Sequence, residues 1–387
     1  MRKLIIVTGH SCLDSGGVGT HIRVLTDSLS KAGIEHSLIL GTGKKSKIYY
    51  LINKMLDRFF RLNGNYYSTN LLSSIDFFKS RIENEIIKIG TDYSFLIHCH
   101  DRQSLIAAIQ LKNKYDIKAI QTIHAPFRQQ YEDHLEMSKT LIPYYIRALD
   151  TSFLNKADGF IAVDELQKDI LINDYSSLIN NKYIKIIHNA VEEQLLNSPN
   201  KLDCDDFHVV ARYLHKKNGV EYAIRAFHKF YESKFYDNSK LIILGEGGEL
   251  ERLQKLVNEF KLSNYIEFKG AVNRKVCLEY ISRAKSSLVP SIPVGIYIEA
   301  TSLTMLESLA LKTPLIASNI GGMKEVLDGK DAAFLVEPEN IEDIYLSFIE
   351  ISKGNYINKV ANGFELIKSG YTSTQWLNKH IEFYSKY

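Results

Sequence analysis

The sequence predicts an α/β protein built from two doubly wound domains. Short runs of β-branched and other apolar residues alternate with longer segments of helical periodicity, and this pattern occurs twice along the 387 residues. A polar stretch that contains Ser198, Pro199 and Asn200 separates the two series, as a linker would. Domains of this kind bind ligands outside the carboxyl ends of their parallel strands, so the cleft between them is the expected site.

The expected strands of the first series are residues 4–7, 36–40, 95–98, 119–123, 159–163 and 184–187. Those of the second series are residues 207–211, 241–244, 266–268, 287–289, 315–317 and 333–336. His10 and Ser11 interrupt the first apolar run, which therefore indicates a buried strand rather than a secretory segment. No stretch approaches the ~18 to 20 apolar residues of a membrane span, so any membrane contact is expected to be peripheral.

Charge and cysteine content disfavour several classes of protein. The chain has 48 Lys and Arg against 45 Asp and Glu, and its net charge of +3 is too small for a dedicated nucleic-acid-binding protein. The 4 cysteines include no C-x-x-C pair, which argues against a zinc ribbon or a disulfide framework and favours a cytoplasmic location. Asp203 and Asp205 form a D-x-D motif, but they precede a strand instead of following one, so we expect no metal there.

A glycine-rich loop follows the first expected strand and opens a helical pattern. Gly17 and Gly19 let the backbone approach an anion at the start of that helix. A dinucleotide site needs a third glycine, but Ile22 stands in that place, so binding of NAD is not expected. A purely structural glycine turn remains the alternative.

Two charged motifs follow strands of the second series. Arg212 and Lys217 lie five residues apart after the strand at 207–211 and can hold a diphosphate from two sides. Glu299 precedes a helix that Ser302 is expected to cap, and Glu307 lies about two turns along it. The free amides of that helix start suit a phosphate, and the carboxylates can accept hydrogen bonds from ribose and sugar hydroxyls. Solvated surface charge is the alternative for both motifs.

The motifs form an ordered set, and together they resemble the retaining GT-B glycosyltransferases of family four, the glycosyl transferases group 1. The resemblance spans about residues 2–327. In chain order, the set contains Gly-Gly-x-Gly, Thr122-x-His124, His188-Asn189-Ala190-Val191, Arg212 with Lys217-Asn218-Gly219, Gly245-Glu246-Gly247, Glu299-x7-Glu307 and Ser318-Asn319-Ile320-Gly321-Gly322. Each motif is weak alone, whereas the ordered set is specific for the fold and for use of a nucleotide sugar.

The resemblance implies two Rossmann-like domains that face a central cleft. Residues 1–195 would form the acceptor-side domain, with a terminal helix at about residues 370–387 packing back on it, and residues 200–369 would bind the nucleotide sugar. The implied reaction retains the anomeric configuration, uses no metal or other cofactor, and moves a hexosyl or N-acetylhexosaminyl group from a UDP-sugar to a glycan, lipid-linked or protein acceptor.

Site residues are carried over by motif. The residues implied to be catalytic are His124, Arg212, Lys217 and Glu299. Those implied to bind the nucleotide sugar are Gly17, Gly19, Arg212, Lys217, Val272, Glu299, Leu303, Thr304 and Glu307. Those implied to lie on the acceptor side are His100 and Asp101. The chain departs from the family in a longer loop at 292–298 and in Ala300, where glycine is usual. A nucleotide-sugar epimerase, a sugar phosphorylase and a non-catalytic partner of a transferase remain as alternatives.

Residues 44–61 are a local exception to the near-neutral charge of the chain. They contain six basic residues and one acidic residue, a net charge of +5 (6 − 1), and their apolar residues recur at helical spacing. This pattern predicts an amphipathic basic helix that rests on the anionic inner face of a membrane. An ordinary domain helix with solvated lysines is the alternative.

Overall fold

The computed structural model describes residues 2–11, 13, 16–41, 67–126, 142–197, 204–295 and 297–387, and these divide into two compact units. Unit 1 comprises residues 1–13, 25–187 and 379–387, and unit 2 comprises residues 14–24 and 188–378. The first helix, α1 (Gly16–Lys31), and the last, α14 (Ser373–Tyr384), each begin in unit 2 and end in unit 1.

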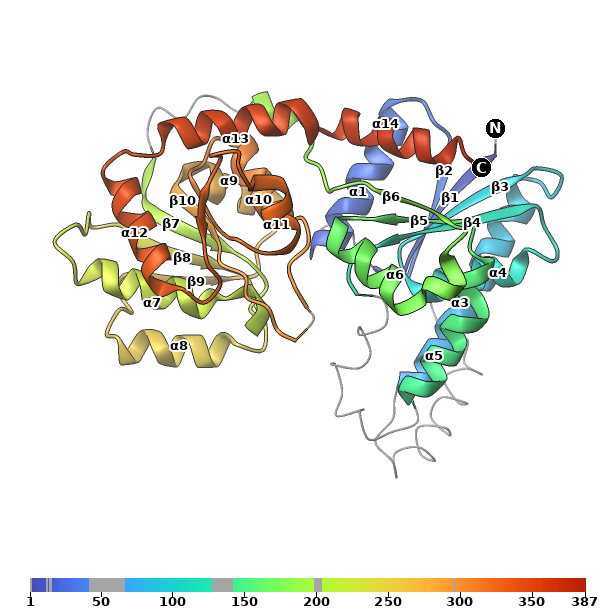
Figure 1. Ribbon diagram of the computed structural model, residues 1–387, viewed down its shortest axis with the longest axis horizontal. Helices are drawn as coiled ribbons and strands as arrows, with labels where there is room; N and C mark the ends of the chain where they lie inside the picture. The colour runs from blue at the N-terminus through green and yellow to red at the C-terminus, as the bar shows by residue number, and fades with distance from the viewer. Residues whose placement is uncertain are drawn as a thin grey trace. The chain divides into compact units, whose positions relative to one another are not determined.

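Unit 1 contains one parallel six-stranded sheet (Figure 1). Its strands are β1 (Lys3–Thr8), β2 (His36–Leu40), β3 (Phe95–Cys99), β4 (Ile117–Ile123), β5 (Gly159–Ala162) and β6 (Tyr183–Ile186), in the order β2-β1-β3-β4-β5-β6. Its helices include α3 (Tyr67–Ile89), α4 (Arg102–Leu111), α5 (Ile142–Phe153) and α6 (Glu165–Ile179). The strand order reverses between β1 and β3, so a crevice is expected at the carboxyl ends of these two strands.

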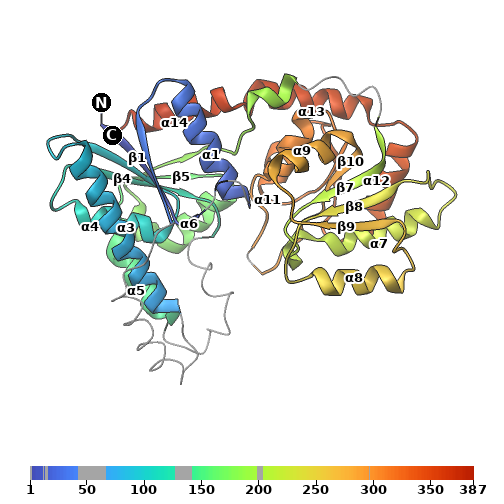
Figure 2. The same cartoon turned by 180° about the vertical axis from the view of Figure 1, so that it is seen from behind.

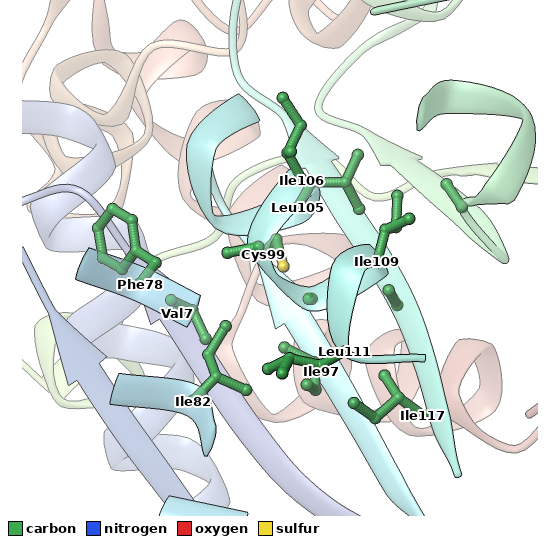
Figure 3. Packing of buried hydrophobic residues seen from close by; sticks show 14 of the residues in the cluster. Val7, Phe78, Ile82, Ile97, Cys99, Leu105, Ile106, Ile109, Leu111 and Ile117 are labelled. Atoms are coloured by element: carbon green, nitrogen blue, oxygen red, sulfur yellow. The ribbon is translucent and has the colours of Figure 1, made fainter. Parts of the chain in front are cut away.

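Alternate residues of the central strands form the core of unit 1. Val7 of β1 and Ile97 of β3 face the side of the sheet that α3 and α4 cover, and Figure 3 shows Ile82 of α3 beside Val7 and Leu111 of α4 beside Ile97. Cys99 lies in the same cluster and is fully buried, where it acts as a small apolar residue. The two ends of the chain meet at this unit, since the Arg2 Nε donates a hydrogen bond of 2.7 Å to the carbonyl of Tyr387.

Unit 2 repeats the architecture with a different strand order. Its strands are β7 (Asp205–Ala211), β8 (Lys240–Leu244), β9 (Ile266–Gly270), β10 (Ala284–Val289), β11 (Leu315–Ser318) and β12 (Phe334–Val336), in the parallel order β12-β11-β10-β7-β8-β9. Its helices are α7 (Val220–Tyr231), α8 (Leu250–Glu259), α9 (Arg274–Arg283), α10 (Leu303–Ala310), α11 (Gly321–Leu327), α12 (Ile341–Ser352) and α13 (Ile357–Gly370). The order reverses between β7 and β10, which places the expected ligand crevice at their carboxyl ends.

Both faces of the second sheet are covered. Val209 packs with α9, α10 and α11 in one core, whereas its neighbour Val210 packs with α7, α8 and α12 in another. Figure 2 shows α7 and α8 on one side of β7–β9 and α9 on the other. Because successive side chains of a strand point to opposite faces, a parallel sheet buried on both sides requires continuous apolar runs, and these runs are what the sequence contains.

The predicted α/β class with two doubly wound sheets is confirmed, and each of the expected strands is present within a few residues of its expected bounds. Among the described residues, no helix has both the length and the apolar character needed to cross a membrane. The basic segment at residues 44–61 lies outside the described residues.

Candidate functional site

Arg212 lies at the switch point of the second sheet, directly after β7. Its guanidinium donates to Ser302 Oγ at 2.9 Å and to Asn218 Oδ1 at 2.7 Å, and its Nη2 lies 2.8 Å from Glu299 Oε1. The side chain is only 9% exposed. Arg212 is therefore held in one orientation by groups from two loops, the one that follows β7 and the one between β10 and α10.

Lys217 approaches the same carboxylate from a short 3-10 turn, with its Nζ 3.6 Å from Glu299 Oε2. Gly219 closes this turn with φ of 62°, and a Cβ there would lie 1.8 Å from the carbonyl oxygen of Pro290. Only glycine permits this close approach. The loops after β7 and β10 are thus brought together, which sets both cations beside Glu299.

Glu299 is 12% exposed, and its charge state is fixed by its neighbours. Burial alone would raise the pKa of its carboxyl, but Arg212 and Lys217 outweigh burial and the pKa is lowered. The backbone carbonyl of Glu299 also accepts a hydrogen bond from Gly322, and a Cβ on Gly321, which has φ of 49°, would collide with that carbonyl at 2.1 Å. The Gly321-Gly322 motif therefore supports the loop that presents Glu299.

The start of α10 lies next to Arg212. Ser302 caps the helix as predicted, since its hydroxyl accepts from the amide of Met305 while it also accepts from Arg212. Leu303 and Thr304 form the first turn, and the Thr304 hydroxyl donates to the carbonyl of Ala211 at the end of β7. The amides of this turn and the Arg212 guanidinium thus form one region of positive potential.

Glu307 lies in the second turn of α10 and has a different set of partners. Its carboxylate, 6% exposed, forms an ion pair with Arg274 of α9, and Arg274 also donates to Glu192 at 2.6 Å. Arg23 of α1 donates to the other oxygen of Glu192 at 2.9 Å. Burial raises the pKa of the Glu307 carboxyl, and Arg274 offsets this only in part. Sequence reasoning did not single out Arg23, Glu192 or Arg274.

The glycine loop groups with unit 2. Gly17 is exposed and Gly19 is buried in the first turn of α1. Further along α1, the His21 Nδ1 lies 2.8 Å from Asn189 Oδ1, and the Asn189 amide donates to the carbonyl of Thr301 at 2.7 Å. This chain of hydrogen bonds connects α1 to the loop between Glu299 and α10.

The base-side residue named from the sequence, Val272, lies between β9 and α9. It is half-buried and packs against the core beneath α9 and α10.

The acceptor-side residues lie in unit 1 at the switch point between β1 and β3. Asp101 caps α4, accepting from the amide of Ser104 at 2.9 Å and from that of Gly9 at 2.6 Å. Burial raises the pKa of its carboxyl, although these amides act in the opposite direction. His100 Nδ1 lies 3.1 Å from His124 Nε2. His100 and Asp101 line a pocket of about 330 Å³.

The structure thus separates the named residues into two groups. His100, Asp101 and His124 belong to unit 1, whereas the remaining named residues belong to unit 2. The D-x-D motif lies elsewhere: Asp205 is at the amino end of β7, opposite to Arg212, and pairs with Arg283 at 2.6 Å, while Asp203 lies outside the described residues.

Comparison with solved structures gives the class of protein. Sucrose-phosphate synthase from Thermosynechococcus elongatus is 18% identical with a TM-score of 0.71, and the alignment covers 100% of this chain and 99% of that one. HepE from Anabaena, solved in complex with UDP-glucose, is 14% identical with a TM-score of 0.69, covering 99% and 100%. At these identities the likeness shows the fold alone, which is the two-domain GT-B fold of glycosyltransferases.

Sequence comparison then gives the family. The glycosyl transferases group 1 family matches residues 192–362, and glycosyltransferase family 4 matches residues 15–195. An uncharacterized glycosyltransferase of Methanocaldococcus jannaschii is 24% identical over 400 residues, covering 99% of this chain and 97% of that protein. The chain belongs to the group 1 glycosyltransferases, as the ordered motifs predicted, and it is a glycosyltransferase enzyme.

Proposed function

We propose that the protein transfers a sugar from a UDP-sugar, with retention of anomeric configuration and without a metal, to a hydroxyl group of a glycan, lipid-linked or protein acceptor. The observation that carries the proposal is the convergence of Arg212 and Lys217 beside the start of α10 at the switch point of the second sheet. Two cations and free helix amides at one point suit a diphosphate.

The chemistry explains why cations are needed there. Transfer breaks the bond between the anomeric carbon and the diphosphate oxygen, so negative charge develops on the departing diphosphate. Arg212, Lys217 and the amides of Leu303 and Thr304 would stabilise that charge, which is the role that a metal plays in other transferases. A new bond forms between the anomeric carbon and the acceptor oxygen on the same face, and the acceptor proton passes to the leaving phosphate oxygen.

The remaining roles follow the resemblance and the geometry. Glu299, beside the two cations, would accept hydrogen bonds from hydroxyls of the donor sugar, and the resemblance gives His124 a sugar-contacting role. Glu307 would hold the ribose, and the backbone near Val272 would contact the base. Uridine is supported by the complex of the structural relative HepE with UDP-glucose.

The pocket in unit 1 supports an acceptor that carries hydroxyl groups. It is lined by polar His10, His100, Asp101 and Gln103 and by the ring of Phe77. An aromatic ring with surrounding carboxylate, amide and imidazole groups suits a sugar ring, whose faces are apolar and whose edges are polar.

Peripheral membrane association rests on sequence alone. The net charge of residues 44–61, +5 (6 − 1), supports reversible binding to anionic lipid on the cytoplasmic side, with each basic residue contributing ~1 kcal/mol near such a surface. Co-sedimentation with anionic vesicles at low salt, lost at high salt, is the expected result, and a protein that stays in the supernatant at low salt would contradict it.

The proposal is tested by incubating the purified protein with UDP-, GDP- and ADP-sugars, with and without oligosaccharide acceptors. Proton NMR coupling constants of the product report the configuration at the anomeric carbon. We expect transfer from a UDP-sugar, with the configuration retained and the rate unchanged by EDTA. An inverted product would refute retention, and isomerised or phosphorolysed donor without transfer would favour an epimerase or a phosphorylase.

A further inference from the structure

Four charged side chains form a continuous row in unit 2. Arg23 of α1 pairs with Glu192, Glu192 pairs with Arg274, and Arg274 pairs with Glu307 of α10. Arg274 is central, because its Nη2 donates to Glu192 while its Nη1 donates to Glu307. Its side chain is 16% exposed, so this bridge is largely shielded from water.

The backbone on each side of this bridge is anchored. Asn273 caps α9 by accepting from the amide of Val276, which fixes Arg274 as the first residue of the helix. Val191, next to Glu192, exchanges backbone hydrogen bonds with the chain around the start of α14, donating to Tyr371 at 3.0 Å and accepting from Ser373 at 2.8 Å. Arg274 therefore joins two elements that are already held in place.

We propose that Arg274 is a positioning residue that fixes the carboxylate of Glu307 for the ribose hydroxyls of the donor, and that Glu192 holds Arg274 in this position. The inference rests on the proposed function, in which Glu307 binds the ribose. A ribose diol needs a carboxylate whose two oxygens have a defined orientation. Arg274 occupies one oxygen, Oε1, and thereby leaves Oε2 to be directed at the nucleotide.

Arginine suits this task better than lysine. Its planar fork presents separate N–H groups to two carboxylates at once, whereas an ammonium is a single point of charge. Glu192 and Glu307 both form ion pairs with the guanidinium of Arg274. Without a cation between them, the two carboxylates would repel each other.

The bridge also governs the charge of Glu307. The charged and titratable groups that face it are Arg274, Glu192, Arg23 and the Cys277 thiol. Burial favours the protonated carboxyl and raises its pKa, whereas Arg274 opposes this. Removing Arg274 is expected to raise the pKa of Glu307 further. As the pH is lowered, the variant would therefore protonate Glu307 at a higher pH than wild type does.

The test measures how strongly the protein prefers ribose to deoxyribose. UDP, GDP and ADP are titrated by calorimetry, and the one that binds best is compared with its 2′-deoxy counterpart over a range of about pH 5.5 to pH 8.5. The variants are R274A, R274K, E192Q and E307A. R283A is the matched control, because Arg283 ends the same helix and pairs with Asp205 away from Glu307.

We expect wild type and R283A to prefer the ribose form by roughly ten- to a hundredfold in Kd, as for a hydrogen bond to a charged group. R274A should reduce this preference at least about threefold at neutral pH. As the pH is lowered, R274A should lose the rest of its preference for ribose at a higher pH than wild type does. R274K should restore part of the preference, and E192Q should lower it less than R274A.

Different failures are distinguishable. If R274A keeps the preference and pH profile of wild type while E307A loses the preference, the inference about Arg274 is wrong and the role of Glu307 stands. If E307A keeps the preference, or no diphosphate binds, the proposed nucleotide site fails and the inference fails with it. If R274A gives no cooperative thermal transition, E192Q decides, and wild-type behaviour of E192Q would overturn the proposal.

Discussion

Replacing Lys217 by alanine is expected to slow sugar transfer strongly while leaving the protein folded and nearly as stable as wild type. The Lys217 ammonium lies 3.6 Å from Glu299, and the side chain is 39% exposed. An ion pair this long and this accessible contributes about 0 to 1 kcal/mol to the free energy of unfolding. Loss of the Lys217 charge should therefore change the stability of the fold little.

The expected effect on the rate is much larger. In the proposed reaction, Lys217 stabilises the charge that develops on the leaving diphosphate, and loss of one such preorganised donor lowers kcat by roughly 10²- to 10³-fold, or about 2.7 to 4 kcal/mol of transition-state stabilisation. The experiment therefore compares the loss of transition-state stabilisation with the much smaller change in the free energy of unfolding.

Arg212→Ala provides the contrast. Arg212 donates to Ser302 and Asn218 and pairs with Glu299, which is itself mostly buried. Removing one partner of a buried ion pair costs about 3 to 5 kcal/mol of stability, and here the Glu299 carboxylate would keep only its longer contact with the more exposed Lys217. This variant should therefore lose activity and melt at a lower temperature, whereas Lys217→Ala should lose activity alone.

The assay is initial-rate transfer at saturating donor, together with thermal unfolding of each purified variant. Lys216→Ala is the matched control, because Lys216 is exposed and its replacement removes the same charge one residue away. The leaving-group role of Lys217 would be refuted by a kcat within a few fold of wild type, or by an equal loss in the Lys216 variant.

The remaining predictions concern the nucleotide, the helix cap and metals. Glu307→Ala should weaken binding of the free nucleoside diphosphate by at least about tenfold in calorimetry, whereas Glu299→Ala should spare that binding and impair transfer. Ser302→Ala should lower the free energy of unfolding by about 0.5 to 2 kcal/mol, measured by denaturant titration, because it removes the cap of α10. Treatment with EDTA and added Mg²⁺ should each leave the transfer rate unchanged, and a rate restored only by Mg²⁺ would contradict the metal-free proposal.

The features that the sequence predicted well are local ones. The β-branched runs, the helical periods and the cap at Ser302 each depend on residues a few positions apart, and each is present. The sequence also predicted the grouping of Arg212, Lys217 and Glu299, because the carboxyl ends of β7 and β10 meet at one edge of a parallel sheet.

The contacts that the sequence did not predict join distant positions. Arg274 lies 33 residues from Glu307 and 82 from Glu192, and an arginine in the first turn of a polar helix is usually a solvated surface charge. Similarly, sequence order gives no sign that residues 14–24 group with unit 2, because that grouping depends on His21 and Arg23 contacting residues beyond position 187.

The pairing of Glu299 explains why its loss should spare the nucleotide. Arg212 and Lys217 are the cations proposed for the diphosphate, and both already lie on Glu299. A bound diphosphate would compete with this carboxylate for the same two charges, so alanine at position 299 removes a competitor as well as a ligand of the sugar. Affinity for the free diphosphate should therefore be equal to that of wild type or higher in calorimetry, while transfer falls. A loss of diphosphate affinity as large as that of Glu307→Ala would show that Glu299 binds the nucleotide itself.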